Sequence, residues 1–195
     1  MMVAGALTML LLSSPARSQP TWASRTDAAT NGTTAPGAQH VRQVIVGVVE
    51  NVDVRRWESL RDVFAESVFV DYTSLFGGSA RNYTAAELVD NWRQLLESFS
   101  MTRHVLGPIV VDGNEAEVQA RCPVRIYHFL RDAPGGQEWV VVGQFVFTLA
   151  KESGTWRIQR IVLDVQSQEG NTNLLVEALL AADKRSSCPK CVVGK

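Results

Sequence analysis

Four polar residues of this chain are of types that can move a proton together. Asp53 supplies a carboxylate, His104 and His128 supply imidazoles, and Tyr72 supplies a phenol. A carboxylate beside an imidazole fixes the tautomer of the ring and raises its basicity. A histidine held in this way could remove a proton next to a carbonyl group, while a tyrosine donates to the developing enolate oxygen. These side chains act together only if the elements that carry them meet.

The N-terminal half of the expected domain is largely helical. Apolar residues recur at helical spacing from Val41 to Val52, which is typical of an amphipathic helix. Asp53 ends that pattern, and a second short helix is expected over residues 55–65. Residues 67–72 alternate and are rich in residues that favour β-structure, so they predict a strand.

A further helix is expected to begin after Thr84. Thr84 and Glu87 form the pattern of a capping box, and this helix runs to about Glu97. The later elements are four long strands and a closing helix: 102–113, 114–130, 137–151, 154–166 and 173–182. Hairpin connections are too short for parallel crossovers. We therefore expect an α+β fold, a cone-shaped curved antiparallel or mixed sheet around the N-terminal helices, with a pocket at its mouth.

Alternation along these strands places the four polar residues at that pocket. His128 continues the apolar face of its strand, and His104 shares a face with Val110. Tyr72 shares a face with the valines of its own strand, and Asp53 lies at the edge of the apolar stripe of its helix. We expect all four side chains on the inner side or at the mouth of one apolar cavity.

Each of these residues also has a structural interpretation. Asp53 could cap the helix that follows it, and this role is compatible with catalysis. Tyr72 could be a packed residue whose hydroxyl has a partner. An inward histidine is usually structural, but His104 is accompanied by a carboxylate, which favours a functional role.

Two stretches carry a family resemblance: DVRRWESLRDVFAESVFVDYTSLFGG and TRHVLG. They resemble the SnoaL-like group of the nuclear-transport-factor-2-like superfamily and, within it, the scytalone dehydratases. The resemblance extends over residues 40–168 and implies the cone fold. It implies that Asp53 and His104 form an acid–base dyad, that Tyr72 holds a water against the substrate carbonyl, and that His128 contacts the substrate.

The chain departs from the dehydratase pattern at three positions of the implied substrate pocket. Val52 stands where that family has a second tyrosine, and Gly143 and Phe145 fall near its serine and asparagine. The pocket is therefore expected to be more apolar on that side. The dyad is retained, so the resemblance implies a cofactor-independent lyase or isomerase that acts on a small hydrophobic molecule with a carbonyl group.

Composition excludes several other classes of protein. The formal net charge is −1 over 195 residues, and there is no basic stripe of the kind that nucleic acids need. The strands show no cluster of two histidines and a carboxylate, and Cys188 and Cys191 are too few for a zinc site, which takes four ligands. We therefore expect no metal and no cofactor, and treat residues 184–195 as a disordered tail in which a local disulfide is an alternative.

The N-terminus predicts export. An apolar run from Val3 to Leu12 precedes Ala16-Arg17-Ser18, which fits the small-x-small pattern of a signal peptidase site. We expect a signal peptide over 1–18, a flexible linker over 19–39 and the domain over 40–183. The mature protein would then be secreted or periplasmic without membrane attachment; a misassigned start and a cytoplasmic location are the alternative.

Two other functions remain open at this stage. The same cone could be a non-catalytic pocket for a small molecule, or a dimerising accessory domain that pairs through the outer face of its sheet as a homo-oligomer. The separation of Asp53 and His104 discriminates between them. A hydrogen-bond distance beside a cavity favours chemistry, whereas side chains turned apart favour binding or scaffolding.

Overall fold

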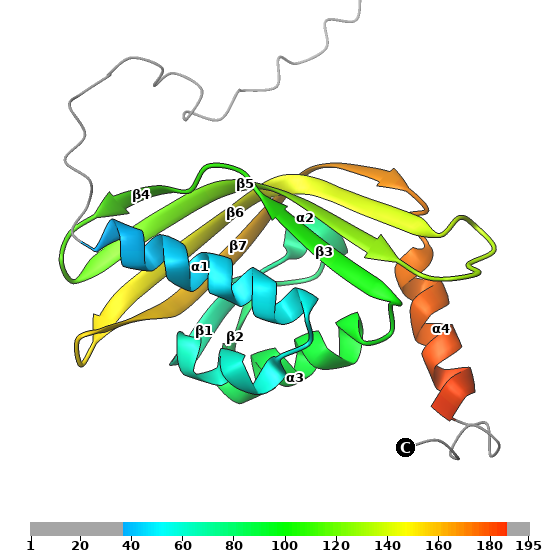
Figure 1. Ribbon diagram of the computed structural model, residues 1–195, viewed down its shortest axis with the longest axis horizontal. Helices are drawn as coiled ribbons and strands as arrows, with labels where there is room; N and C mark the ends of the chain where they lie inside the picture. The colour runs from blue at the N-terminus through cyan, green and yellow to red at the C-terminus, as the bar shows by residue number, and fades with distance from the viewer. Residues whose placement is uncertain (1–36, 187–195) are drawn as a thin grey trace, which may run out of the picture. The chain divides into compact units, whose positions relative to one another are not determined.

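The structure is a computed structural model that describes residues 37–186 (Figure 1). The expected signal peptide, nearly all of the expected linker, and Cys188 and Cys191 lie outside the described residues. Within 37–186, no helix is long and apolar enough to cross a membrane. The elements are α1 (Ala38–Asp53), the 3-10 helix η2 (Trp57–Val63), β1 (Phe64–Asp71), α2 (Thr73–Phe76), β2 (Arg81–Thr84), α3 (Ala85–Leu96), β3 (Met101–Leu106), β4 (Val110–Gly113), β5 (Glu117–Phe129), β6 (Glu138–Glu152), β7 (Thr155–Gly170) and α4 (Leu174–Ser186).

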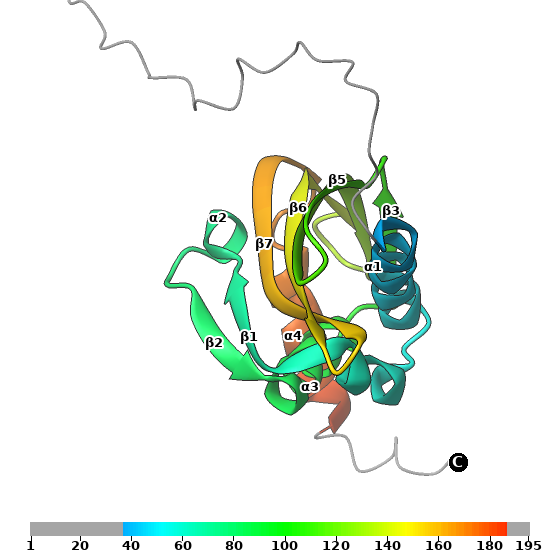
Figure 2. The same ribbon diagram turned by 90° about the vertical axis from the view of Figure 1, so that its left-hand side faces the viewer.

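The strands form one curved mixed sheet, which confirms the expected fold class. Its order is β2-β1-β7-β6-β5-β3, with β4 also paired to β5. β1 runs parallel to β7, and the other neighbours are antiparallel. Figure 2 shows the sheet curving from β2 at one edge to β3 at the other, with α1 on the inner side.

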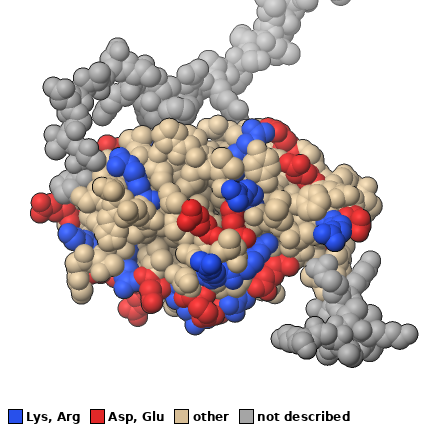
Figure 3. Space-filling model, viewed as in Figure 1, with Lys and Arg blue, Asp and Glu red and all other residues tan. Residues whose placement is uncertain are grey.

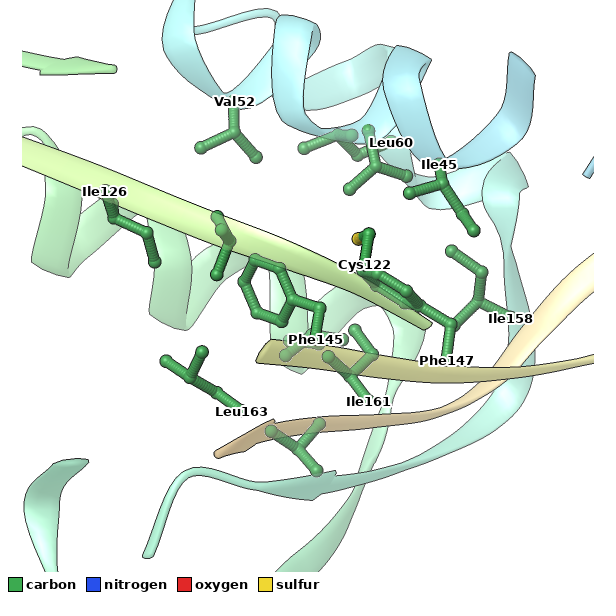
Figure 4. Close-up of a cluster of buried hydrophobic side chains, with 14 of the residues drawn as sticks. Ile45, Val52, Leu60, Cys122, Ile126, Phe145, Phe147, Ile158, Ile161 and Leu163 are labelled. Carbon is green, nitrogen blue, oxygen red and sulfur yellow. The ribbon is translucent and has the colours of Figure 1, made fainter. Parts of the chain in front are cut away.

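The core lies between the inner face of the sheet and the helices. The apolar stripe of α1 is buried, as its spacing predicts. Figure 4 shows Ile45 and Val52 of α1 facing Phe145 and Phe147 of β6, with Leu60 of η2 beside them. Because α1 contacts β3 and β4 while α3 contacts β1 and β2, the two helices cover opposite parts of this face.

The capping box is present as expected. The hydroxyl of Thr84 accepts from the backbone N–H of Glu87, and the Glu87 carboxylate accepts from the backbone N–H of Thr84. Such a cap stabilises a helix by roughly 1 kcal/mol. It fixes the start of α3, whose side chains close one side of the cavity described below.

Several elements differ from the expected ones. The short helix α2 and the strand β2 are not among those we expected, and α4 ends at Ser186, within the expected tail. The helix expected over 55–65 is the shorter η2, because β1 already begins at Phe64. The strand expected over 102–113 is split into β3 and β4 by residues 107–109. Pro108 has no N–H for a ladder, and the chain pairs to β5 in a new phase after it. Val110, which we placed on the inner face, is therefore exposed, and Val111 is buried instead.

Gly143 of β6 lies where the backbone of β7 approaches most closely. A Cβ at this position would come 2.3 Å from the carbonyl oxygen of Asp164, beside a register shift between the two strands. Gly47, in α1, has open space around the same position. The two glycines therefore form a matched pair for substitution.

We predict opposite effects on stability for Gly143→Ala and Gly47→Ala. The first should lower the free energy of unfolding by about 1–3 kcal/mol, since β7 must shift. The second should raise it by about 0.5–1 kcal/mol, since alanine suits a helix interior better than glycine. Urea denaturation followed by circular dichroism measures both. Equal effects of the two substitutions would contradict this interpretation of Gly143.

Candidate active site

Asp53 and His104 meet where the end of α1 reaches the edge of the sheet. β3 is the last strand of its side of the sheet, so N–H groups on its outer side have no strand to bind. One carboxylate oxygen, Oδ2 of Asp53, accepts from the backbone N–H of His104 at 2.8 Å. The other, Oδ1, lies 2.7 Å from Nδ1 of the His104 ring. Asp53 therefore binds both the backbone and the ring of His104.

This pairing determines which ring nitrogen of His104 carries the hydrogen. A carboxylate only accepts, so Nδ1 carries the hydrogen and Nε2 has a free lone pair. The side chains of His104 and Asp53 are 10% and 11% exposed, so little water competes for the contact. Asp53 is not a helix cap, because η2 begins after Arg56 and has no side-chain cap. The expected hydrogen-bond distance is therefore present, and the capping interpretation is wrong.

An apolar cavity of about 90 Å³ lies inside the sheet beside this pair. His104, His128 and Tyr72 all line it, and Val52 and Phe145 line it as expected. Gly143, the third expected pocket residue, is buried in the sheet and does not line it. The remaining lining residues are Val48, Val49, Leu75, Phe76, Trp92, Leu95, Leu96, Ile126, Phe147, Ile161 and Leu163.

The cavity borders a wider groove beside α2. That groove has a volume of about 510 Å³, and Tyr72, Phe76, Trp92 and Leu95 line both spaces. A ligand larger than the inner cavity could therefore occupy the cavity and the groove together. On this side the walls are mainly aromatic and aliphatic.

The outer side of the dyad is different. A groove of about 550 Å³ between α1 and β3 is lined by Glu50, Asp53, Arg103 and His104, among other residues. Figure 3 shows acidic and basic side chains gathered on this face of the molecule. The dyad thus separates a charged outer surface from an apolar interior.

Tyr72 lies in the turn between β1 and α2, not in the strand that we expected over residues 67–72. β1 ends at Asp71, whose Oδ1 accepts from both the backbone N–H and the hydroxyl of Thr73. Burial raises the pKa of Tyr72 well above the ordinary value of 10, and the neighbouring Trp92 side chain offsets part of this rise. The Tyr72 hydroxyl therefore keeps its proton, which is available to a ligand.

Trp92 is a functional candidate that sequence reasoning missed. Its position on the apolar side of the helix expected after Thr84 suggested core packing alone. The residue lines the cavity together with Tyr72. No spacing rule connects Trp92 to Tyr72, because they meet only through the packing of α3 against β1.

His128 lies on β5 between two aromatic rings. Its ring centroid is 4.9 Å from that of Phe99 and 4.5 Å from that of Trp139. Nδ1 lies 3.3 Å from the carbonyl oxygen of Trp139, which only accepts, so Nδ1 is the donor. Burial, with a smaller contribution from His104, lowers the pKa of His128 from 6.5 to about 4. The ring is therefore neutral near pH 7.

Among residues 37–186, no group of three or more histidine, cysteine, aspartate or glutamate side chains could hold a metal ion. The two histidines that line the cavity are instead paired on the side away from it. His104 is held by Asp53 and His128 by the Trp139 carbonyl. Each pairing leaves one hydrogen-bonding function for a ligand.

The comparisons with known proteins agree with this fold. The model of the SnoaL-like domain family matches residues 36–162. No curated protein sequence matches the chain. A solved structure of the Kfla4162 protein from Kribbella flavida is 20% identical, with a TM-score of 0.67 over 72% of this chain and 97% of that chain.

Two further solved structures carry the names of enzymes. A provisionally assigned scytalone dehydratase from Novosphingobium aromaticivorans is 19% identical, with a TM-score of 0.58 over 68% of this chain and 85% of that one. The hexachlorocyclohexane dehydrochlorinase LinA-type3 from Novosphingobium barchaimii is 13% identical, with a TM-score of 0.57 over 69% and 90%. At these identities the likeness concerns the fold. With its family model matched over most of the domain, the chain belongs to the SnoaL-like family of the nuclear-transport-factor-2-like superfamily.

Proposed function

We propose that the protein is a cofactor-independent lyase or isomerase that removes a proton next to the carbonyl group of a small apolar substrate. The observation that carries this proposal is the two-point contact of Asp53 with His104, at 2.8 Å and 2.7 Å. It directs the proton-accepting Nε2 away from the carboxylate, in a residue that lines an apolar cavity. A base without competing water in such a site suits the weakly acidic C–H bond.

The reaction would follow from the three polar groups of the cavity. Nε2 of His104 takes the α-proton, and the C–H electron pair forms an enolate whose oxygen accepts from the Tyr72 hydroxyl. Asp53 stabilises the imidazolium that results. If the β-carbon carries a hydroxyl, the imidazolium returns the proton to it, water leaves, and an unsaturated carbonyl compound remains. Without a leaving group, return of the proton to another carbon gives an isomer.

His128 would orient the substrate from β5, the strand paired with that of His104. Because Nδ1 donates to the Trp139 carbonyl, the other ring nitrogen of the neutral imidazole can only accept. A hydroxyl of the substrate satisfies it, whereas a carboxylate would meet a lone pair. The names of the dehydratase and the dehydrochlorinase above refer to eliminations, which is consistent with this chemistry.

We predict that the protein exchanges the α-protons of simple ketones with deuterium oxide. Cyclohexanone and the larger 2-tetralone are suitable probes, and NMR follows the loss of their α-proton signals. Asp53→Asn should slow this exchange by about 10²–10⁴-fold. The Asn amide presents N–H groups to Nδ1, so the ring turns to the tautomer that has no lone pair toward the cavity.

His104→Phe should abolish the exchange, whereas His40→Phe, at an exposed position in α1, should leave it unchanged. Thermal melts confirm that each variant is folded. If wild type exchanges no faster than His104→Phe while it binds the ketones, the protein is a binding module and the proposed chemistry fails.

We also predict that His128 makes the protein less stable in mild acid. In the unfolded chain its ring titrates near pH 6.5, and in the folded protein near 4. Below pH 6.5 the unfolded state therefore binds a proton that the folded state does not bind. The contribution of His128 to the free energy of unfolding is fully present above pH 6.5, and roughly 3 kcal/mol of it is lost as the pH falls toward 4.

Urea denaturation at several pH values between 7.5 and 4 tests this with His128→Phe, whose ring fits between Phe99 and Trp139. The variant should lose about 3 kcal/mol less than wild type over this interval, and His40→Phe should follow wild type. Parallel loss in wild type and His128→Phe would show that His128 is not held neutral.

A further inference from the structure

The inner cavity is small for a substrate. Its volume is about 90 Å³, whereas pockets that enclose a small-molecule ligand usually have roughly 300–1,000 Å³. The groove beside α2, at about 510 Å³, lies within that range. Because Tyr72, Phe76, Trp92 and Leu95 line both spaces, a ligand that extends past these side chains occupies the cavity and the groove.

Tyr72 stands at the boundary between the two spaces. Its hydroxyl is the group that donates to the substrate carbonyl in the mechanism above, and His104, which takes the α-proton, lines the cavity alone. A substrate with its α-carbon at His104 and its carbonyl at Tyr72 therefore directs its remaining part into the groove. The groove then contributes to the choice of substrate.

The wall of the groove that carries Phe76 is preformed. Oγ of Ser74 in α2 donates to the carbonyl oxygen of Leu163 at 2.5 Å and accepts from the backbone N–H of Val165 at 3.1 Å. These two hydrogen bonds fix α2 to β7. Phe76 is nevertheless 49% exposed, although burial of an aromatic side chain is favourable. Its ring thus offers a fixed apolar contact to a ligand in the groove.

The other end of the groove is polar and carries one charge. Thr73, Ser79, Arg81, Tyr83 and Asn91 line the groove but not the cavity. Arg81 is a cation, and no aspartate or glutamate is among the described residues that line this space. Figure 2 shows that β2, which carries Arg81, lies with α2 on the side of the sheet away from α1. The polar end of the groove therefore attracts an anion.

Arg81 and Tyr83 form a pair of hydrogen-bond donors there. Nε of Arg81 donates to the hydroxyl oxygen of Tyr83 at 2.6 Å, and the guanidinium carbon lies 4.5 Å from the centroid of the Tyr83 ring. The ring thus helps to hold the guanidinium in place. Because the Tyr83 oxygen accepts from Arg81, its own hydrogen is available to a ligand.

The charge of Arg81 is not neutralised by a close carboxylate of the protein. None of the ion pairs among residues 37–186 includes it. The carboxylate of Glu87 interacts with it electrostatically, but that group accepts from the backbone N–H and the hydroxyl of Thr84. A planar guanidinium binds a carboxylate with two parallel N–H···O hydrogen bonds.

We propose that the groove binds the end of the substrate remote from the reacting carbonyl, and that this end is a carboxylate which Arg81 and Tyr83 bind. The substrate class is then an elongated keto acid, with its ketone in the cavity and an apolar spacer against Phe76 and Trp92. This inference rests on the proposed function, to which it adds two specificity-determining residues. The charged end fits only the groove, because the open ring nitrogen of His128 in the cavity is an acceptor.

The test uses three ketones that differ at one end. The acid, 4-(4-oxocyclohexyl)benzoate, has a ketone, an aromatic spacer and a carboxylate. Its methyl ester lacks the charge, and 4-phenylcyclohexanone lacks the whole group. Isothermal titration calorimetry gives the affinity of the full chain for each ketone. The variants are Arg81→Gln, Tyr83→Phe and, as the control for loss of one cation, Arg131→Gln at an exposed position outside both spaces.

We expect wild type to bind the acid at least about tenfold more tightly than the ester, because the hydrogen bonds to a carboxylate are charge-assisted. Arg81→Gln should abolish this preference, Tyr83→Phe should reduce it about threefold, and Arg131→Gln should retain it. High salt should weaken binding of the acid but not of the ester. Since both ligands are compared on the same protein, partial unfolding of a variant leaves their ratio unchanged.

Equal affinity of wild type for the acid and the ester would overturn the proposal, as would a preference that survives in Arg81→Gln. Binding of the acid should also shift the NMR signals of the His104 ring, because the ketone lies in the cavity when the carboxylate lies in the groove. A preference for the acid that leaves the His104 signals unchanged would show a carboxylate contact at the surface alone, and the proposal would be wrong.

Binding needs no turnover, so the two proposals fail separately. If the acid binds through Arg81 and shifts the His104 signals but wild type exchanges none of its α-protons, the proposed proton abstraction is wrong and the role of the groove is supported. If exchange depends on His104 but the acid and the ester bind and exchange alike, the function stands and the role of Arg81 and Tyr83 is wrong.

Discussion

The carboxylate of Asp53 makes two hydrogen bonds at the edge of the sheet, one to the backbone and one to the ring of His104. The backbone bond supplies the partner that an edge strand lacks, and it fixes the end of α1 against β3. The ring bond then sets which nitrogen of His104 carries the proton. Because one side chain serves both purposes, the geometry of the site cannot relax without loosening the packing of α1 on the sheet.

The polar side chains on the other walls of the cavity are subject to a similar constraint. An apolar interior penalises every polar group without a partner, yet chemistry needs polar groups that are free. His104 and His128 resolve this conflict because each is held from behind, by Asp53 and by the Trp139 carbonyl, while the Tyr72 hydroxyl keeps its proton. Two acceptors and one donor remain for a ligand. The charged carboxylate of Asp53 lies outside this layer, where it sets the protonation of the His104 ring.

Much of this could be predicted from local pattern, and the remainder depends on long-range packing. The stripe of α1 and the inward face of β5 follow from periodicities of 3.6 and 2, and they placed His128 at the cavity correctly. Asp53, which we expected at the same cavity, lines the outer groove instead. The break at Pro108 changed the phase of the strand after His104, and the turn at Asp71 took Tyr72 out of β1. Trp92 gave no sequence signal, because its importance arises from a neighbour distant along the chain, Tyr72.

The tautomer of His104 is the most direct test of the account. Nitrogen-15 NMR of the ring distinguishes a protonated Nδ1 from a protonated Nε2, and the three histidines of the chain can be assigned with His40→Phe and His128→Phe. The account predicts that at neutral pH His104 carries its hydrogen on Nδ1 in wild type and loses this preference in Asp53→Asn. A hydrogen on Nε2 in wild type would contradict it, because no base would then face the cavity. A hydrogen that stays on Nδ1 in Asp53→Asn would show that Asp53 does not set the tautomer.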